Sequence, residues 1–294
     1  MANARVIVKR RKSVRNIRKI TRTMQLIATA RFQAAYNRAM ATKPYTERLA
    51  ELAAALSDTM QGEVSHPLMQ ANPDAKRVAL VVITTKRGLC GGYNTNVLRH
   101  ALAHLREAEG RGVETDGYMV GKKGINYFRF LRREMRERIT DISDAPRFNQ
   151  VEPIANGLMD RFTRGELGAV HVAYMRFLST ARQAAEVVQL LPLSSETTAN
   201  GGGSARRRAV QYEFSPDPKE LLAELLPATV RVQLFQCFTD ATVSEQVGRM
   251  VAMKAATDAA GEMITALTRQ YNRARQTQIT MELLDIVGGA NALA

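Results

Sequence analysis

The chain has 294 residues, of which 45% are hydrophobic and 24% charged, so it can bury a sizeable core. Its 42 Lys and Arg against 28 Asp and Glu give a net charge of +14, which predicts an acidic partner: nucleic acid, anionic lipid or an acidic protein. Two cysteines exclude a disulfide scaffold, and the best candidate for a membrane span, Val78 to Thr85, has only the length of a strand.

Residues 1–60 predict one long helix with a strongly basic surface. Apolar side chains recur at spacings of three and four residues: Val14, Ile17, Ile20, Met24, Ile27, Ala28, Phe32 and Ala35. Thr21 and Arg31 interrupt this stripe, and Pro44 is expected to kink or split the helix. No Asp or Glu precedes residue 47, so the basic side chains have no acidic partner within this part of the helix.

Residues 75–210 alternate between strand and helix patterns, which is typical of a small, Rossmann-like α/β sheet domain. The expected strands are 78–84, 115–120, a short one near 139, 169–176 and 187–191. The expected helices are 94–109, one between the second and third strands, and 154–163. The glycine-rich stretch 88–92 is interpreted as a tight connection from the first strand to the first helix.

Residues 215–294 predict a second long helix. Its three- and four-residue repeat comprises Val243, Met250, Met253, Thr257, Ala260, Ile264, Leu267, Tyr271, Ala274, Gln278 and Met281. Sixty helical residues span roughly 90 Å, which a domain of this size cannot cover, so the helix needs a partner helix. The fold class is therefore α/β, with an antiparallel coiled coil of the two terminal helices and an α/β domain inserted between them.

Candidate chemical sites are weak. The stretch from Gly117 to Lys123 resembles a phosphate-binding loop only faintly, because its glycine spacing is wrong and no Ser or Thr follows the lysine. His100 and His104 are four residues apart on a predicted helix, but lack an evident third metal ligand and are interpreted as surface residues. Cys90 is interpreted as a small buried residue. We therefore expect no catalytic residues, cofactor or metal.

Two other functions stay open at this point. A basic coiled coil could bind nucleic acid through phosphate contacts, although no aromatic residues are interleaved with the basic ones for base stacking. An enzyme could place a small-molecule site at the carboxyl ends of the strands, but a convergent set of acid, base or metal ligands is not found.

Several separated motifs resemble one known family. They are RKITRTM (Arg18–Met24), RGLCGGYN (Arg87–Asn94), MVAMKAATD (Met250–Asp258), YNRARQ (Tyr271–Gln276) and ITMELLDIVG (Ile279–Gly288). Together, and in this order, they resemble the γ subunits of F-type ATP synthases. The resemblance covers both terminal helices and the start of the sheet, whereas residues 125–165 are much less diagnostic.

The resemblance implies a rotor without catalytic residues of its own. In that family one copy of the coiled coil turns inside a hexamer of α and β subunits, and the globular end rests on the c-ring together with the ε subunit. The membrane is then contacted only through the c-ring, nucleic acid is not a partner, and the expected location is the cytoplasmic face of a bacterial inner membrane. Torque from ion flow couples to ATP synthesis or hydrolysis in the β subunits.

Matching positions imply individual roles. Contacts with the α/β hexamer are implied for Met24, Arg249, Arg275, Gln276, Thr280 and Glu282, and contacts with the c-ring for Tyr212 and Phe214. Lys86 departs from the family, which usually has an acidic residue before the arginine of the glycine-rich turn. The cysteine pair of plant-type members is also absent, because Cys90 and Cys237 are far apart in the sequence.

Overall fold

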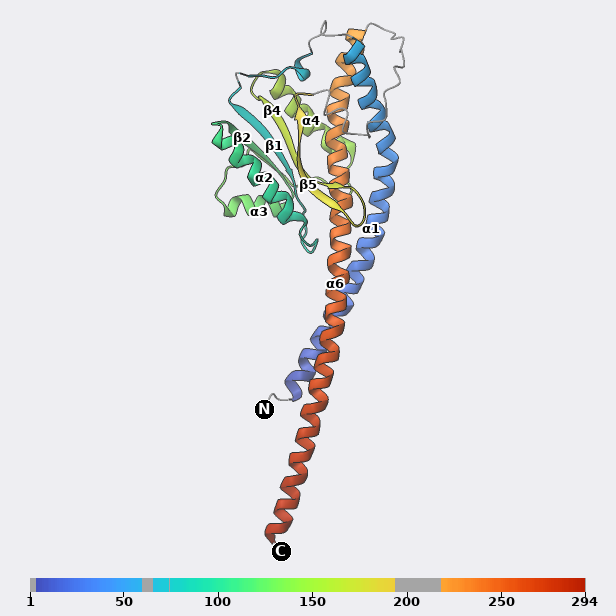
Figure 1. Ribbon diagram of the computed structural model, residues 1–294, viewed down its shortest axis with the longest axis vertical. Coiled ribbons are helices and arrows are strands. Elements are labelled where there is room, and N and C mark those ends of the chain that lie inside the picture. The colour runs from blue at the N-terminus through green and yellow to red at the C-terminus, as the bar shows by residue number, and fades with distance from the viewer. Residues whose placement is uncertain (1–3, 60–65, 74, 194–217, 294) are drawn as a thin grey trace. The chain divides into compact units, whose positions relative to one another are not determined.

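The computed structural model describes residues 4–59, 66–73, 75–193 and 218–293 (Figure 1). The chain divides into two compact units, residues 31–248 and residues 1–30 together with 249–294. Two long helices, α1 (Ala4–Thr59) and α6 (Pro218–Leu293), each contribute to both units. We describe each unit by itself.

The larger unit contains a five-stranded sheet in the order β3-β2-β1-β4-β5. Its strands are β1 (Arg77–Ile83), β2 (Glu114–Val120), β3 (Glu137–Ile139), β4 (Ala169–Phe177) and β5 (Gln183–Leu191). The first four are parallel to their neighbours, and β5 is antiparallel to β4. Its helices are the 3-10 turn η1 (Pro67–Met69), α2 (Tyr93–Gly110), α3 (Lys122–Phe130) and α4 (Phe148–Thr163).

Helices cover both faces of this sheet (Figure 1). Strand β1 is central, and Leu80, Val81 and Val82 are fully buried, as expected for a strand with helices on both sides. Alternation along β2 separates the two faces. Gly117 lies with Phe128 of α3 on one face, whereas the Tyr118 hydroxyl accepts a hydrogen bond from Arg161 of α4 at 2.7 Å on the other.

The first half of α6 belongs to the core of the sheet domain. Its inward side chains recur every four residues: Leu222, Leu226, Val230, Leu234 and Phe238. All five are buried in one hydrophobic cluster with residues of β1, β4 and β5. This half of the helix therefore folds as part of the α/β domain, and its stability comes from tertiary packing.

In the smaller unit, residues 4–30 of α1 and residues 249–293 of α6 run antiparallel. Thr21 hydrogen-bonds Thr257, Arg18 approaches Gly261, and Arg11 lies over the ring of Tyr271. Along these contacts the residue numbers of α6 increase as those of α1 decrease, so the two helices are antiparallel. The predicted antiparallel pairing of the terminal helices and the mixed α/β fold class are both confirmed.

The seam of this helix pair is narrower on α1 than predicted. Its buried positions, Val14, Thr21 and Ala28, are seven residues apart, so Thr21 is part of the seam and does not interrupt it. In contrast, Ile17 and Ile20 are more than half exposed. Small side chains face the partner helix because they let the two backbones approach closely.

The repeat predicted for α6 is confirmed as far as Ala274. Met253, Thr257, Ala260 and Leu267 are buried, and the residues between them in the repeat are half-buried. Gln278 and Met281, which continue the pattern, are exposed. Since Arg11 lies opposite Tyr271, the first residue of α1 reaches only about residue 278 of α6.

Three element boundaries differ from the predictions. Helix α1 continues across Pro44 without being split. Helix α4 begins at Phe148, six residues before the predicted start, and contains Pro153; the Arg147 amide donates to Gln150 Oε1 at 3.2 Å at its start. Strand β5 starts four residues earlier than predicted, because it pairs along the full length of β4.

By length and composition, one helical stretch within Leu221–Gly288 is apolar enough to cross a membrane, which the sequence interpretation had not identified. Of the most apolar window, 44% is buried inside the structure. A core helix passes the same test, so this finding carries no membrane assignment.

A buried carboxylate on α6 provides a test of this packing. Burial raises the pKa of Asp240 from 3.8 to about 6, although Gln236 donates to it and the charges of Arg176 and Lys43 oppose the shift. A raised folded-state pKa means that stability falls as the pH rises from about 4 to 6. Above pH 6 the ionised group costs on the order of 1–3 kcal/mol.

We therefore expect Asp240→Asn to raise the free energy of unfolding by on the order of 1–3 kcal/mol at pH 7.5. The gain should shrink as the pH falls to 4.5, as measured by urea unfolding of the full chain at both values. The exposed Asp258→Asn on the same helix is the control and should change stability by less than about 0.5 kcal/mol. Equal stability of Asp240→Asn and the native chain at pH 7.5 would contradict the assigned burial cost.

Candidate functional site

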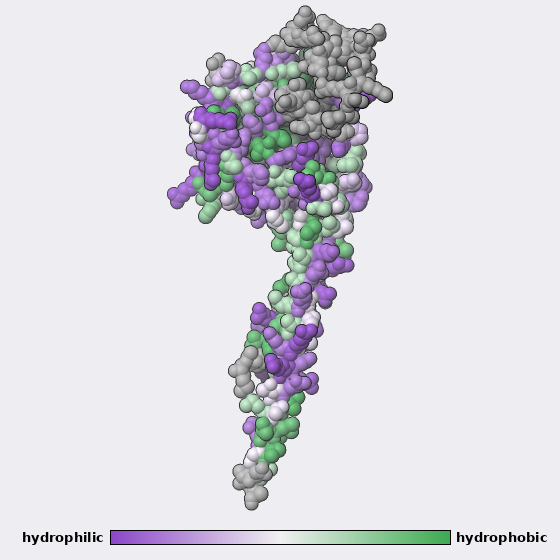
Figure 2. Space-filling view, in the orientation of Figure 1, coloured by the Kyte–Doolittle hydropathy of each residue, from purple (hydrophilic) through white to green (hydrophobic). Residues whose placement is uncertain are grey.

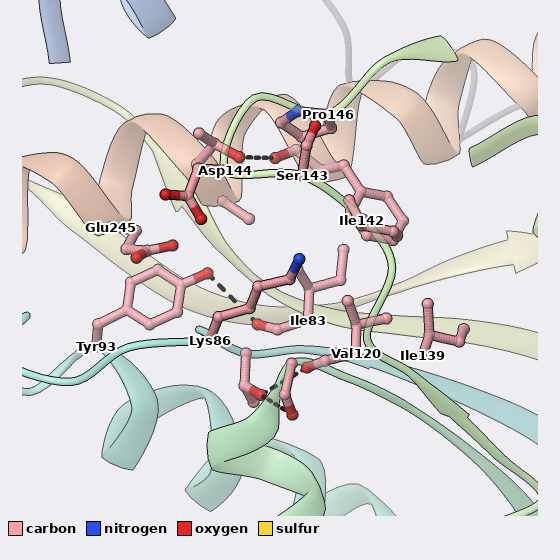
Figure 3. A pocket seen from close by; sticks show the side chains of 15 residues that line it. Ile83, Lys86, Tyr93, Val120, Ile139, Ile142, Ser143, Asp144, Pro146 and Glu245 are labelled. Atoms are coloured by element: carbon pink, nitrogen blue, oxygen red, sulfur yellow. Dashed lines mark hydrogen bonds between the residues drawn. The ribbon is translucent and has the colours of Figure 1, made fainter. Parts of the chain in front are cut away.

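The carboxyl edge of the sheet is where an α/β fold of this order would bind a ligand. The chain leaves β1 toward β2 on one side, and β4 lies on the other, so β1 marks the switch point of the topology. Here Phe238, Ala241 and Thr242 of α6 line this place, and a cavity of only about 40 Å³ remains (Figure 3). That volume holds a few water molecules at most, whereas small-molecule sites occupy roughly 300–1,000 Å³.

The cavity is polar at one end. Lys86 of the turn after β1, Asp144 of the loop after β3 and Glu245 of α6 line it (Figure 3). The Tyr93 hydroxyl donates to the carbonyl of Ile83 at 3.4 Å, and burial raises its pKa. Lys86, whose positive charge is unusual for the resembled family, thus lines the same cavity as two carboxylates of the chain.

Asp144 connects the same loop to α1. Its carboxylate accepts a hydrogen bond from Arg31 of α1 at 2.9 Å and lies 3.7 Å from the guanidinium of Arg87. Arg31, which looked like an interruption of an apolar stripe, is therefore a contact between the helix and the sheet edge. The sequence offered no signal for Asp144, because 113 residues separate the partners.

The stretch Gly117–Lys123 is not a phosphate loop. The backbone amide of Gly124 donates to Thr84 Oγ1 at 2.8 Å, and that of Lys123 to the carbonyl of Thr85 at 3.1 Å. An anion at the start of α3 would have to bind these amides, but they already donate to the two residues that follow β1. A Cβ on Gly121 would lie 2.3 Å from the carbonyl oxygen of Thr84, so the glycine serves this close approach.

The glycine-rich turn after β1 packs against α6. A Cβ on Gly248 would lie 2.7 Å from the carbonyl oxygen of Cys90, so helix and turn touch backbone to backbone. Cys90 is buried and accepts a hydrogen bond from Asn94 at 3.3 Å. The predicted role of the turn as a tight connection is consistent with this packing.

A larger open depression of about 410 Å³ lies between α2, β2 and α3. Its charged lining residues are Glu109, Arg133 and Glu134, of which Glu109 and Arg133 form an ion pair with each other. Among the described residues, we find no group of three or more His, Cys, Asp or Glu side chains arranged to hold a metal ion. Both cysteines are buried free thiols, and burial raises the pKa of Cys237.

Four of the sequence-predicted contact residues come together near the end of α6. Arg275, Gln276, Thr280 and Glu282 are all exposed within two helical turns. Thr280 Oγ1 donates to the carbonyl of Gln276 at 3.0 Å, and Gln278 donates to Glu282 at 2.9 Å. Apart from these local bonds, the segment presents its polar groups to solvent.

The other predicted contact residues lie elsewhere. Met24 is half-buried on α1. Arg249 is buried, 8% exposed, and lies roughly 39 Å along α6 from Arg275. Tyr212 and Phe214 lie outside the described residues.

Large apolar side chains surround the polar contact segment. Ile279, Met281, Leu283, Leu284, Ile286 and Val287 are between 45% and 69% exposed. Figure 2 shows hydrophobic surface gathered near this end of α6. An isolated apolar helix end of this kind typically marks an interaction surface.

One residue pair that the sequence interpretation missed fixes the helix register. Thr257 Oγ1 lies 2.8 Å from Thr21 Oγ1, and both residues are buried. A single polar pair in an apolar seam disfavours shifted alignments, because a slip would bury both hydroxyls without this bond. The polar residue within the stripe at Thr21 was the available signal.

Comparisons with known proteins agree with this architecture. A profile described as ATP synthase matches residues 3–293. The ATP synthase gamma chain of Rhodopirellula baltica is 44% identical over all of this chain and 99% of its own length, and that of Leptospira biflexa is 40% identical over the full length of both. The chain belongs to the ATP synthase γ-chain family. A γ chain is a non-catalytic subunit of ATP synthase, so the expected lack of catalytic residues follows from the family.

Solved structures support the fold. A chain of the Euglena gracilis mitochondrial ATP synthase, from a structure described as OSCP/F1/c-ring, has a TM-score of 0.67 at 19% identity over 99% of this chain and 94% of its own. A second chain, from the rotor of the same enzyme, has a TM-score of 0.61 at 17% identity over 94% of this chain and 98% of its own. The γ-chain fold thus holds at low sequence identity.

The contact between Gly248 and the glycine-rich turn yields a prediction. Gly248→Ala places a methyl group 2.7 Å from a carbonyl oxygen, which should lower the free energy of unfolding by about 1–3 kcal/mol despite the better helix propensity of alanine. Thermal unfolding of the full chain measures it. The matched control is Gly261→Ala on the same helix, where the nearest atoms are at 3.9 Å; we expect it to be neutral or stabilising. Equal melting temperatures for the two variants would show that the turn yields freely.

Proposed function

We propose that the chain is the central-stalk rotor of an F-type ATP synthase, which transmits torque between a membrane-embedded c-ring and a catalytic hexamer of α and β subunits. Membership of the γ-chain family supports this, as do the descriptions of the similar structures as rotor and as F1/c-ring assembly. Ion flow would turn the ring and the shaft, and the shaft would change the nucleotide affinity of each β subunit in turn.

The observation that carries the proposal is the unpaired end of α6. Beyond about residue 278 the described part of α1 offers it no partner, yet it exposes six large apolar side chains. Within the family, this segment would turn inside a sleeve formed by the hexamer. Apolar surface without specific pockets suits a bearing, since it can be covered at every angle of rotation.

The polar residues of this segment suit contacts that break and re-form. Arg275, Gln276, Thr280 and Glu282 can hydrogen-bond a β-subunit loop, and each exposed bond contributes only about 0.5–1.5 kcal/mol. Met24 and Arg249 are proposed as further contacts with the hexamer. Because Met24 is half-buried and Arg249 buried, their contribution is expected to be smaller in area.

The remaining assignments follow from the family resemblance. We propose c-ring contacts at Tyr212 and Phe214, association with an ε subunit, one copy per complex, and a location on the cytoplasmic face of a bacterial inner membrane, where the c-ring alone provides the membrane contact. We also retain the functional division into a helix of residues 1–60, an α/β domain of 75–210 and a helix of 215–294.

The charge of α1 fits an acidic protein partner. Of the described residues before Glu47, the exposed basic ones include Arg5, Lys9, Arg10, Arg15, Lys19 and Arg22. Nucleic acid could satisfy the same charge, but it would leave the apolar end of α6 uncovered. A protein partner with both acidic and apolar surface accounts for the two features together.

The direct experiment is a pull-down of the tagged full chain from its native host in mild detergent, with the co-purified proteins identified by mass. We expect α and β subunits, with ε and the c-ring. Recovery of nucleic acid or ribosomal proteins without ATPase activity would refute the rotor assignment.

The contact segment can be tested inside the assembled enzyme. We expect the double variant Arg275→Ala/Gln276→Ala to weaken assembly or coupling several-fold, because two polar contacts of about 1 kcal/mol each are lost. Proton pumping per ATP hydrolysed, in membrane vesicles, measures coupling. The matched double variant Lys122→Ala/Lys123→Ala removes two exposed basic residues of α3 and should leave the ratio unchanged. Equal ratios in both variants would count against the assigned contact.

A further inference from the structure

Three of the four histidines of the chain lie around one face of the sheet domain. His100 and His104 are one helical turn apart on α2, and His171 is on β4 beneath that helix. The sequence interpretation recognised only the pair on α2, because 67 residues separate His104 from His171. The fold brings His104 and His171 into contact, which their distance in the sequence did not indicate.

The rings of His104 and His171 are in contact. Their centroids are 4.4 Å apart and the ring planes are inclined by 54°. His171 Nδ1 is buried and has no hydrogen-bond partner in the described structure. A buried polar nitrogen without a partner costs free energy and is rare in folded proteins, so this atom calls for a bound species.

Both imidazoles are held in the neutral form. Burial and, to a smaller extent, the neighbouring His104 together lower the pKa of His171 to about 4. Burial also lowers the pKa of His104, in part opposed by Glu107 and supported by Arg111. An imidazole with the ordinary pKa of about 6.5 is already neutral at pH 7.5, and the neutral ring carries the lone pair that binds metal ions.

We propose that His104 and His171 form a two-histidine binding site for a transition-metal cation such as Zn²⁺. Imidazole nitrogens favour Zn²⁺, Cu²⁺ and Ni²⁺ over Mg²⁺ or Ca²⁺, which prefer oxygen ligands. Water completes the coordination. The cation satisfies the orphaned nitrogen and links α2 to β4. The site does not depend on the rotor assignment.

The proposal is tested by titrating Zn²⁺ into the metal-free full chain at pH 7.5 in a calorimeter, with thermal unfolding followed in parallel. We expect one Zn²⁺ per chain, bound in the micromolar range. At a hundredfold excess over the dissociation constant, binding should raise the melting temperature by about 5 °C. His104→Ala and His171→Ala should each weaken binding at least tenfold and abolish the thermal shift.

The matched control is His66→Ala, which removes the fourth histidine of the chain; its ring accepts a hydrogen bond from the amide of Leu68 and lies apart from the pair. This variant should bind Zn²⁺ like the native chain. If His171→Ala does not fold, the half-exposed His104→Ala decides the question alone. No stoichiometric binding below about 100 µM Zn²⁺, or equal losses in all variants including His66→Ala, would overturn the proposal.

Discussion

Helix α6 is 76 residues long, and its apolar side chains must be covered along almost all of that length. An isolated helix gains too little from backbone hydrogen bonds to be stable in water, so each segment depends on what packs against it. Residues such as Leu226 and Phe238 are covered by the sheet, and Met253 to Leu267 belong to the unit that α6 forms with α1. The insertion of an α/β domain between two terminal helices satisfies this requirement, since one chain supplies both kinds of cover.

Several glycine and threonine residues are explained by the close approach of helix backbones to neighbouring elements. Gly248 and Gly121 allow α6 and α3 to touch the ends of β1 and its turn, and Thr21 and Thr257 place hydroxyls where an apolar seam was expected. The same packing removes the crevice in which Rossmann-like folds bind nucleotides, because α6 fills the switch point beside β1. In this chain the Rossmann-like sheet therefore packs against a helix at the place where related folds bind a ligand, which is consistent with a non-catalytic subunit.

Most elements of the fold were predictable from the sequence, and each wrong or missing prediction has a physical cause. The spacing of apolar residues predicted the long helices, the strands and the buried positions of α6 as far as Ala274, because the residues that recur at this spacing are the ones that tertiary packing buries. The same spacing predicted wrongly that Ile17 and Ile20 are buried. Both face outward, because the narrow seam of Val14, Thr21 and Ala28 already makes the contact with α6. The contacts of Asp144 and the histidine pair join distant segments, and no local pattern encodes them.

The seven-residue spacing of Val14, Thr21 and Ala28 leaves large apolar residues of α1 on the outer surface, just as the end of α6 leaves Leu284 and Ile286 uncovered. A protein that folded only for itself would bury these side chains or replace them with polar ones. Their exposure on both helices of one unit, beside exposed basic residues, indicates a partner that surrounds this unit. A surrounding partner is what the proposed hexamer provides, whereas a nucleic acid would meet the charges and leave the apolar surface in water.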